Sequence, residues 1–436
     1  MIMKIAIVGY GKQGYSSYQY WKLGNDITLC DRELIVNPSP NVTIQCGANY
    51  LDNLDSFDLI VRTPKLHPRD IVAANGQDIL RKVTTNTNEF FRVCPTTNII
   101  GITGTKGKGT TSTLIAKMLE ASGKRVHLGG NIGTPPLDLL DENISKDDYV
   151  VLELANFQLI DIQFSPHIAV CLMVVPEHLD WHADIDEYIS AKQQLFRYQT
   201  ENDVAIYYAL NKSSSDVVGV SPGRKIPYFE TPGANVEDGE IQIAGKSICK
   251  TSDLKLLGKH NWQNVCAALT AVWQITQDVH EISKVITDFV GLPHRLEFLR
   301  EVDGITYYND SFASTPDAAN AAIEAIPQMK VMIIGGFDRE LPLKDFCEHI
   351  KANSESIRSI LLIGASAGRV SENLKSAGFN NFVISPASNM QEVVNDAQKL
   401  AQPKDAIILS PGFPSFDMFK DFEERGIIYK EVVNNL

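Results

Sequence analysis

Short apolar runs alternate with stretches of helical periodicity along the whole chain. This alternation is typical of strands in largely parallel sheets whose faces are covered by helices. It therefore predicts an α/β fold. A helix is expected over Ile185–Tyr198, and the turn-rich Gly233–Gly245 predicts a peripheral segment of short strands. The expected buried strands are Lys4–Val8, Ile27–Cys30, Asp58–Val61, Tyr149–Leu154, Ile168–Val174, Ile305–Tyr308, Lys330–Ile334, Ile360–Ile363 and Ala406–Leu409.

Proline and small polar residues interrupt this pattern at Arg92–Thr97 and again at Gly291–Pro293. A chain of 436 residues is also too long for one ordinary core. We therefore expect three domains. Residues 1–93 form a Rossmann-like domain, residues 94–292 a central parallel sheet of the P-loop ATPase type, and residues 293–436 a second Rossmann-like α/β domain.

A glycine-rich run, GITGTKGKGTTST at Gly101–Thr113, lies between the strand-like Thr97–Ile100 and the helix-like Ser112–Ala121. Glycines let backbone N–H groups close around a phosphate, and the N-terminus of the following helix adds partial positive charge. Lys108 can then reach the β- and γ-phosphates. The run favours a nucleoside triphosphate over a strand–helix turn that binds no nucleotide.

Hydroxyl groups follow this lysine, as Mg²⁺ binding beside a triphosphate requires. Thr110 or Thr111 can supply that ligand. The run departs from the usual P-loop at two positions: Ile102 replaces the first glycine, and Gly109 replaces the Ser or Thr that commonly follows the lysine.

A second glycine pattern, GYGKQG at Gly9–Gly14, follows the first predicted strand, and Asp31 follows the next one. This is the arrangement of a nucleotide-binding βαβ unit. Taken literally it indicates NAD. Because a separate phosphate loop follows and Asp31 comes early, a uridine or other nucleotide is the better interpretation.

The composition restricts the partners. A net charge of −13 argues against nucleic acid or an anionic membrane as a partner. The seven cysteines include no C-x-x-C pair, which argues against a cysteine zinc site and suits a reducing compartment. The N-terminus does not have the pattern of a signal peptide, and no apolar segment is long enough to span a bilayer. We expect a cytoplasmic protein.

Acidic and histidine residues follow two central strands. Glu153 ends one of them, where it is either a Mg²⁺ ligand or a solvated acid. His178 and His182 are four apart, but Pro176 and the lack of an H-E-x-x-H pattern argue against zinc. We expect one histidine to help hold Mg²⁺ or phosphate and the other to lie on the surface. From pattern alone, Lys192 is expected to face solvent.

Polar residues also cluster later in the chain. Asn261 and Asn264 precede or begin a helical run, where they either cap the helix or bind a base. Arg295 lies at the second joint and can clamp phosphate. Asn309–Ser311 end a strand and could hold ribose or a metal-bound water. Ser410–Asp417 follows the last strong strand and is expected to bind substrate.

Together these segments resemble the Mur ligases, the ATP-dependent amide-forming enzymes of peptidoglycan synthesis. The resemblance covers essentially the whole chain and keeps the order of the motifs. The motifs that carry it are GGNIG at Gly129–Gly133, ELANFQL at Glu153–Leu159, GKHNWQNVCAAL from Gly258, GLPHRLE at Gly291–Glu297, NDS at Asn309–Ser311 and SPGFPSFDMFKDFEERG from Ser410.

The resemblance implies a set of site residues. It implies catalytic roles for Lys108, Glu153, His178 and Lys192. Two Mg²⁺ ions are implied, held by Thr110, Glu153, His178 and Lys192, a lysine that is often carbamylated in the family; this overturns the solvent-facing expectation for Lys192. The implied ATP ligands are Gly104, Thr105, Lys106, Gly107, Lys108, Gly109, Thr110, Thr111, Asn264, Arg295 and Asp310. The implied contacts to the UDP substrate are Gly11, Lys12, Gln13, Asp31, Arg32 and Asn131, and those to glutamate are Ser314, Arg339, Ser415 and Phe422.

The implied reaction adds D-glutamate to UDP-N-acetylmuramoyl-L-alanine through an acyl phosphate, and the implied state is a monomer. Four alternatives stay open: the same chemistry with L-glutamate, a folate acceptor, a nucleotide-sensing scaffold that has lost catalysis, and an NAD oxidoreductase.

Several residues depart from the family pattern. Lys106 replaces the usual asparagine, Phe312 replaces a lysine found in some members after NDS, and Arg339 replaces another lysine. Arg62–Lys65 replaces the usual SPG turn of the first domain. Its two basic residues would still suit a diphosphate.

Overall fold

The computed structural model describes residues 2–35, 42–131, 133–256, 258 and 260–436. Ile132 and Lys259, each part of a motif named above, lie outside these residues. The chain forms two compact units: unit 1 comprises Met1–Asp253 and His260–Thr287, and unit 2 comprises Leu254–Lys259 and Asp288–Leu436. The division into three domains stays a prediction.

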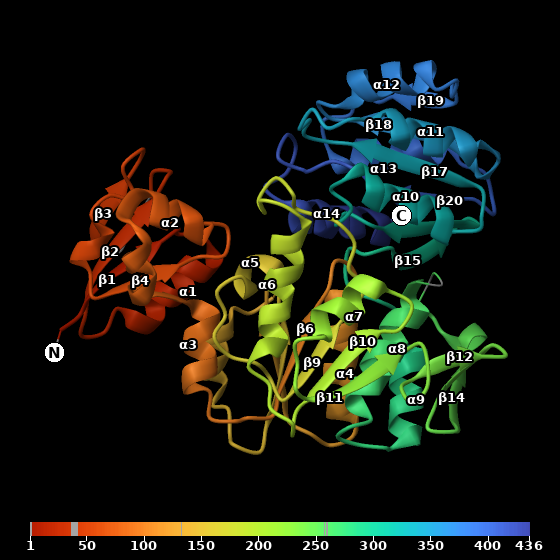
Figure 1. The fold of residues 1–436 in the computed structure, drawn as a ribbon. Helices are drawn as coiled ribbons and strands as arrows, with labels where there is room; N and C mark the ends of the chain where they lie inside the picture. The colour runs from red at the N-terminus through yellow and green to blue at the C-terminus, as the bar shows by residue number, and fades with distance from the viewer. Residues whose placement is uncertain (1, 36–41, 132, 257, 259) are drawn as a thin grey trace. The chain divides into compact units, whose positions relative to one another are not determined.

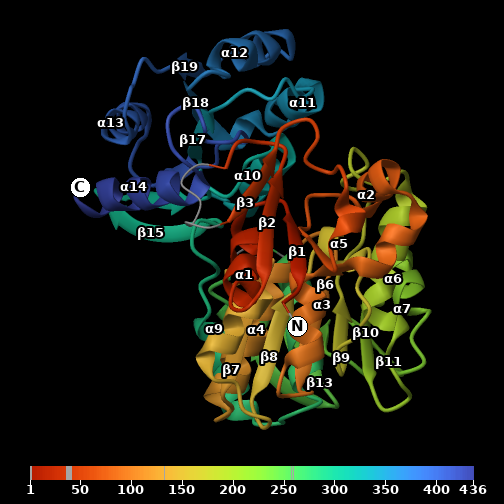
Figure 2. The same ribbon diagram turned by 90° about the vertical axis from the view of Figure 1, so that its left-hand side faces the viewer.

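The N-terminal part of unit 1 is a parallel sheet with the strand order β3-β2-β1-β4-β5 (Figure 1). Helices α1 and α3 lie side by side next to it, as both views show (Figures 1 and 2). The elements are β1 (Lys4–Val8), α1 (Lys12–Trp21), β2 (Asp26–Asp31), β3 (Thr43–Cys46), β4 (Leu59–Arg62), α2 (Pro68–Asn75), β5 (Val83–Thr85) and α3 (Asn86–Val93).

The second sheet of unit 1 has the order β11-β10-β9-β6-β8-β7 and is also parallel. Its elements are β6 (Ile99–Thr103), α4 (Lys108–Ala121), β7 (Val126–Gly130), β8 (Tyr149–Glu153), α5 (Asn156–Leu159), β9 (Ile168–Cys171), α6 (Ile185–Arg197), β10 (Val204–Tyr208), α7 (Lys212–Val218), β11 (Arg224–Tyr228), α8 (His260–Val272) and α9 (Val279–Asp288). An antiparallel sheet of β12 (Asn235–Glu237), β13 (Glu240–Ile243) and β14 (Lys246–Lys250) lies beside α8.

Unit 2 is built on a sheet of order β15-β16-β20-β17-β18-β19, in which β15 alone runs antiparallel to its neighbour. Its elements are β15 (Glu297–Val302), β16 (Ile305–Asn309), α10 (Pro316–Ala325), β17 (Lys330–Gly335), α11 (Lys344–Ala352), β18 (Ile357–Ile363), α12 (Ala367–Ser376), β19 (Phe382–Ile384), α13 (Met390–Leu400), β20 (Ala406–Leu409) and α14 (Phe422–Asn434). Short 3-10 turns occur at Leu54–Ser56, Gln77–Lys82, Pro136–Glu142, Thr251–Asp253 and Ser354–Ser356.

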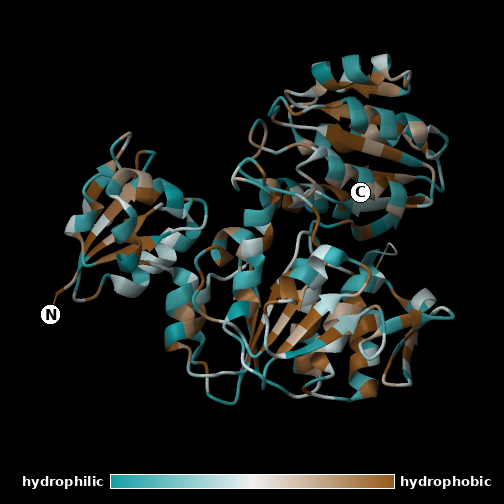
Figure 3. Cartoon of the chain, viewed as in Figure 1, coloured by the Kyte–Doolittle hydropathy of each residue, from teal (hydrophilic) through white to brown (hydrophobic). Residues whose placement is uncertain are grey.

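Apolar residues fill the strands and the helix faces that cover them, which is why the sheets appear brown in Figure 3. Nearly every residue of β1, β6, β17 and β20 is buried. This confirms the prediction of an α/β fold with parallel sheets. No helix within the described part of the chain is long and apolar enough to cross a membrane.

The predicted strands are confirmed to within a few residues, and β1 has the expected bounds. One prediction was too long: the strand expected over Ile168–Val174 ends at Cys171. The residues after Cys171 form the wall of the glycine-rich loop, because Leu172 N–H donates to Thr103 O and Thr105 N–H donates to Met173 O, both at 2.8 Å. The strands that were not predicted are β3, β5, β7, β10, β11, β15 and β19.

Arg62, at the end of β4, joins the two parallel sheets of unit 1. Its guanidinium is 1% exposed and binds the Asp161 carboxylate at 2.6 and 2.8 Å. It also donates to the carbonyls of Phe157 (3.1 Å) and Leu66 (2.7 Å). The expectation that Arg62 could serve a diphosphate is therefore wrong: the residue completes a buried ion pair, and its donors are engaged within the fold.

Replacing Arg62 by leucine should destabilise the protein strongly. The change leaves Asp161 and several carbonyls without their charged donor, so the free energy of unfolding should fall by about 3 kcal/mol. Urea unfolding followed by circular dichroism measures this. Arg81→Leu is the matched control, since Arg81 makes an exposed pair with Asp78 and should change stability by less than about 0.5 kcal/mol. Equal effects of the two variants would contradict the structural role of Arg62.

Candidate active site

The glycine-rich run forms the predicted loop between a strand and a helix. Strand β6 ends at Thr103, and α4 begins at Lys108 with Gly107 as its N-cap. Gly104 has φ +143° and Gly107 has φ +90°, a region of backbone conformation that favours glycine. A Cβ on Gly107 would lie 2.2 Å from Asn264 Oδ1, so only glycine fits there. The loop therefore leads directly into the N-terminus of the fourteen-residue helix α4, whose partial positive charge favours an anion bound at the loop.

Two lysines converge on one carbonyl of this loop. Lys108 Nζ donates to Gly104 O at 3.0 Å and to Thr105 O at 2.9 Å, and Lys192 Nζ donates to the same Gly104 O at 3.3 Å. Lys192 also lies over the Tyr188 ring, 4.3 Å from its centroid. Burial, helped by the charge of Lys108, lowers the pKa of Lys192 to about 7.

The pattern-based expectation that Lys192 faces solvent is wrong, because its side chain is fully buried. Helix α6 buries Tyr188, Ala191, Lys192 and Leu195, which lie on one face at helical spacing. That spacing is readable in the sequence. The apolar neighbours of Lys192 on this face were therefore visible, but the usual exposure of lysine was given more weight than they were.

Several oxygens near the loop are buried without a hydrogen-bond partner among the described residues. They are Thr103 Oγ1, Thr111 Oγ1 and Glu153 Oε2. Glu153 ends β8 and is paired in register with Ile102 of β6, so it lies next to the loop. Unpaired buried oxygens are costly unless a ligand binds them. Oxygen donors of this kind are the ones that Mg²⁺ prefers, so the residues fit that ion.

His178 is held in an unusual backbone conformation beside these residues. Its φ is +57°, and its carbonyl accepts hydrogen bonds from the N–H groups of Trp181 (3.1 Å) and His182 (3.0 Å). Its ring lies 4.8 Å from that of Phe157. Burial lowers the pKa of His178 despite nearby acids, with the charges of Lys108 and Lys192 acting in the same direction. A neutral imidazole is the form that binds a metal.

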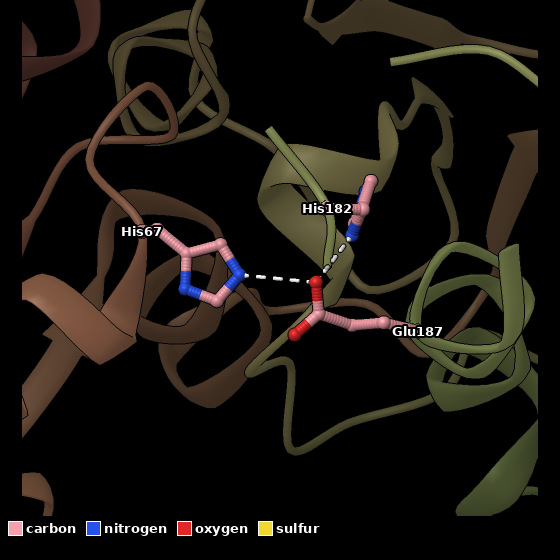
Figure 4. Close-up of side chains that lie close together, drawn as sticks. All are labelled: His67, His182 and Glu187. Carbon is pink, nitrogen blue, oxygen red and sulfur yellow. Dashed lines mark hydrogen bonds and ion pairs between the residues drawn. The ribbon is translucent and has the colours of Figure 1, made fainter. Parts of the chain in front are cut away.

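His182 is 2% exposed and accepts or donates on both ring nitrogens, toward Asn156 at 2.7 Å and Glu187 at 3.1 Å. Of the two histidines, His178 is the exposed one. One of the pair does lie at the surface, as expected, but it is the one that the family resemblance assigns to the metal. Figure 4 shows His182 with Glu187, five residues along the chain, and with His67, which sequence spacing does not connect to them.

The remaining ATP-site prediction in unit 1 concerns Asn264. This residue lies inside α8, is 8% exposed and donates to Asn261 Oδ1 at 2.8 Å. Its amide packs against Gly107 of the glycine-rich loop. The structure thus brings Gly104, Gly107, Lys108, Lys192 and Asn264 together, although Asn264 lies far from the loop in sequence.

The predicted UDP-site residues gather around the first glycine turn. Gly11 is the N-cap of α1, which begins at Lys12. The Asp31 carboxylate accepts from the Tyr10 N–H at 2.6 Å and from the Glu33 N–H at 2.9 Å, so it braces the turn. Lys12 and Arg32 are exposed and Gln13 is partly buried. Asn131 lies elsewhere: its amide is 3.4 Å from Glu153 Oε1.

In unit 2, the NDS segment is held by buried polar groups. Asp310 accepts from the Leu296 N–H at 3.0 Å and from Ser410 Oγ at 2.7 Å, and burial raises its pKa to about 7. The Arg295 guanidinium lies 3.7 Å from the centroid of the Phe312 ring. Phe312 in turn makes an edge contact with Phe422 at 5.1 Å.

Arg425 is a residue of this region for which sequence reasoning assigned no role. It is 1% exposed and donates to Ser311 Oγ (2.9 Å), Ser311 O (2.8 Å) and Phe413 O (3.1 Å). It thereby ties the NDS segment to the loop after β20. The other predicted glutamate contacts differ in exposure: Ser415 is buried, Ser314 is partly buried and Arg339 is exposed.

Comparison with known proteins agrees with this geometry. Residues 102–272 match the Mur ligase middle domain, and residues 294–413 match the glutamate ligase domain of Mur ligases. The UDP-N-acetylmuramoylalanine--D-glutamate ligase of Clostridium novyi is 34% identical over 450 residues, covering 99% of this chain and 97% of that protein. The ligase of the same name from Acetivibrio thermocellus is 36% identical over 462 residues, covering 99% and 96%.

The chain belongs to the Mur ligase family. Solved structures of Mur ligases have a similar fold at low identity. UDP-N-acetylmuramate-alanine ligase from Thermotoga maritima has a TM-score of 0.61 at 18% identity, with 99% of each chain covered. The UDP-N-acetylmuramoylalanyl-D-glutamyl-2,6-diaminopimelate--D-alanyl-D-alanyl ligase of Acinetobacter baumannii has a TM-score of 0.64 at 15% identity, covering 99% of this chain and 93% of that one.

Gly107→Ala should strongly weaken ATP binding in this Mur ligase. A Cβ at this position would clash with Asn264, and the positive φ of residue 107 is unfavourable for alanine. The loop must therefore change its conformation. Isothermal titration with ATP measures the loss. Gly368→Ala is the matched control, because Gly368 lies in α12 with open space around its Cα and no positive φ; this variant should bind ATP normally. Unchanged affinity in Gly107→Ala would contradict the loop's role.

Proposed function

We propose that this protein is an ATP-dependent ligase that joins D-glutamate to UDP-N-acetylmuramoyl-L-alanine in peptidoglycan synthesis. The observation that carries the proposal is the full-length match to ligases of that name. The geometry of the loop supports it, because Lys108 and the N-terminus of α4 concentrate positive charge in a chain whose net charge is −13.

The chemistry follows from the substrate. A carboxylate is a poor acyl donor, so the γ-phosphoryl group of ATP first transfers to the alanine carboxylate, leaving ADP. The glutamate amine then attacks the carbonyl carbon of this acyl phosphate. The amine proton is lost, the C–O bond to phosphate breaks, and an amide forms. Water must be excluded meanwhile, since it hydrolyses the activated acyl group.

The chain's own residues bind and orient the triphosphate. Backbone N–H groups of the glycine-rich loop and of the first turn of α4 bind its phosphates, apart from those of Thr105 and Thr111, which are bonded to the carbonyls of Met173 and Gly107. Lys108 offsets the charge of the transferring group. Asn264 lies against this loop and contacts the nucleotide. In unit 2 we assign Arg295 and Asp310 to ATP as well; the ring of Phe312 under the guanidinium limits the orientations that Arg295 can take.

The donor set of unit 1 fits Mg²⁺. We assign its ligands to Glu153, His178, Lys192 as a carbamate, and a threonine hydroxyl, in two ion sites. Between the two threonines, the unpartnered Thr111 Oγ1 is the better candidate, although the family resemblance implies Thr110. Bound Mg²⁺ supplies positive charge to the transferring phosphoryl group.

Carbamylation of Lys192 requires its amine to be unprotonated. The nitrogen then adds to CO₂ and loses one proton. The burial of this lysine and its lowered pKa make that form accessible near neutral pH. The product is an anion next to Lys108, which removes the repulsion between two ammonium groups that share one carbonyl.

The other assignments complete the proposal. Gly11, Lys12, Gln13, Asp31, Arg32 and Asn131 bind the UDP substrate, and Ser314, Arg339, Ser415 and Phe422 bind glutamate. We assign the chain three domains: a Rossmann-like domain, a P-loop ATPase-type domain and a second Rossmann-like domain. The monomeric state and the cytoplasmic location stay predictions. Phe312 and Arg339, which replace lysines of some relatives, keep L-glutamate as the second candidate amino acid.

The proposed reaction predicts phosphate release from ATP that depends on D-glutamate. The assay uses UDP-N-acetylmuramoyl-L-alanine with D-glutamate, L-glutamate or no amino acid, and Lys108→Ala as the inactive control. Release with L-glutamate alone would retain the mechanism and reject the assigned amino acid. Absence of release with both would reject the proposed function.

Lys192→Ala should lose most activity, and acetate should restore part of it by replacing the missing carbamate. Sodium chloride at equal ionic strength is the control for salt effects, and Lys192→Arg should stay inactive because a guanidinium does not form this carbamate. Full activity of either variant without acetate would contradict the metal-ligand role. Circular dichroism verifies that both variants are folded.

A further inference from the structure

His67 meets His182 and Glu187 in unit 1, although it lies far from both of them in sequence (Figure 4). His67 is the N-cap of α2, His182 precedes α6, and Glu187 lies in the first turn of α6. Glu187 Oε2 is 3.3 Å from His67 Nε2 and 3.1 Å from His182 Nδ1. Two imidazoles and a carboxylate at this spacing first suggest a transition-metal site.

One hydrogen bond of His67 argues against a metal. The Arg69 backbone N–H donates to His67 Nδ1 at 3.1 Å, so that nitrogen carries a lone pair and no proton. An imidazole whose Nδ1 is an acceptor carries its proton on Nε2. Nε2 is the nitrogen that faces Glu187 in Figure 4. It is therefore a donor to the carboxylate and has no lone pair for a metal.

Glu187 instead accepts hydrogen bonds from the segment after β4 and from the segment before α6. Its Oε2 accepts from His67, from His182 and from the Ala183 N–H at 2.9 Å. The second ring nitrogen of His182 pairs with Asn156 at 2.7 Å, three residues after Glu153. This chain of polar contacts begins near the N-terminal sheet and ends beside the assigned metal ligands.

The same network is bonded to the backbone of His178. The backbone N–H of His182 holds the His178 carbonyl, and residue 178 is kept at φ +57°. A non-glycine residue stays in this region only when its surroundings impose it. The neighbouring Trp181 is held by the segment after β4. Its indole N–H donates to Lys65 O at 2.9 Å, Arg69 donates to its carbonyl, and its ring lies 4.3 Å from that of His67.

We propose that His67 and Glu187 are positioning residues that hold the His178 loop, residues 177–183, in the geometry that binds the divalent cation. This rests on the proposed function, in which His178 is a metal ligand. Neither residue touches the cation. The segment after β4 thereby links the domain assigned to the UDP substrate with the metal site, in the place where relatives carry an SPG turn.

The test measures cation binding without turnover. His67→Asn keeps an N-capping acceptor for α2 but is too short to reach Glu187. Mn²⁺ binding, measured by electron paramagnetic resonance in the presence of a non-hydrolysable ATP analogue, should weaken about 10-fold or more, as expected for residues that orient a metal ligand. His167→Asn is the matched control: His167 pairs with Asp203 at an exposed site of the same unit and should leave Mn²⁺ binding unchanged.

Two further variants separate positioning from general damage. Glu187→Gln should weaken Mn²⁺ binding similarly, and His67→Gln, which retains a side-chain N–H donor, should recover part of it. In activity assays, saturating Mg²⁺ should restore kcat in His67→Asn but not in Glu153→Gln. Unchanged Mn²⁺ affinity in His67→Asn and Glu187→Gln would overturn the proposal.

A Zn²⁺ titration addresses the metal alternative. Stoichiometric Zn²⁺ binding that Glu187→Gln abolishes would overturn the positioning role in favour of a metal site; no such binding is expected. The Mn²⁺ measurement needs no turnover, so its result can reject the positioning role without rejecting the proposed function. Normal D-glutamate-dependent phosphate release by the wild type, together with unaltered Mn²⁺ binding by the variants, would reject the positioning role alone.

Discussion

The hydrogen bonds of two lysines to the carbonyl oxygen of Gly104 are the interaction on which the site of unit 1 depends. Lys108 and Lys192 both donate to it, so two amines that would repel each other as cations are held around one oxygen. Burial resolves this conflict by lowering the pKa of Lys192. Gly104 and Gly107 on either side of this turn have positive φ values, which favour glycine.

This loop in turn depends on contacts from distant parts of the chain. Residues after β9 pair with its backbone, and Asn264 of α8 fills the space beside Gly107. Gly107 has no room for a side chain for that reason. The loop is therefore shaped by its neighbours as much as by its own glycines, and its departures from the usual P-loop spelling at Ile102 and Gly109 are compatible with the same geometry.

Buried polar groups serve a similar purpose in the rest of the protein. Arg62 joins the two parallel sheets of unit 1, and Arg425 joins two motif segments of unit 2. Each guanidinium satisfies several carbonyls whose burial would otherwise be costly. A planar group with five donors is suited to this work, because it can hold several loops at once in one geometry. These arginines are thus structural residues placed next to the segments that we assign to substrates.

The sequence by itself determined the α/β class, most strands, the glycine-rich loop and the order of the family motifs, because the periodicity of neighbouring residues and short motifs are enough to identify them. Tertiary structure decided what single polar side chains do. Lys192 is buried because α6 turns that face inward, Arg62 is engaged because Asp161 lies opposite, and His182 is enclosed by His67 and Glu187. Each of these outcomes depends on a partner far away in the chain, and local periodicity carries no information about such partners.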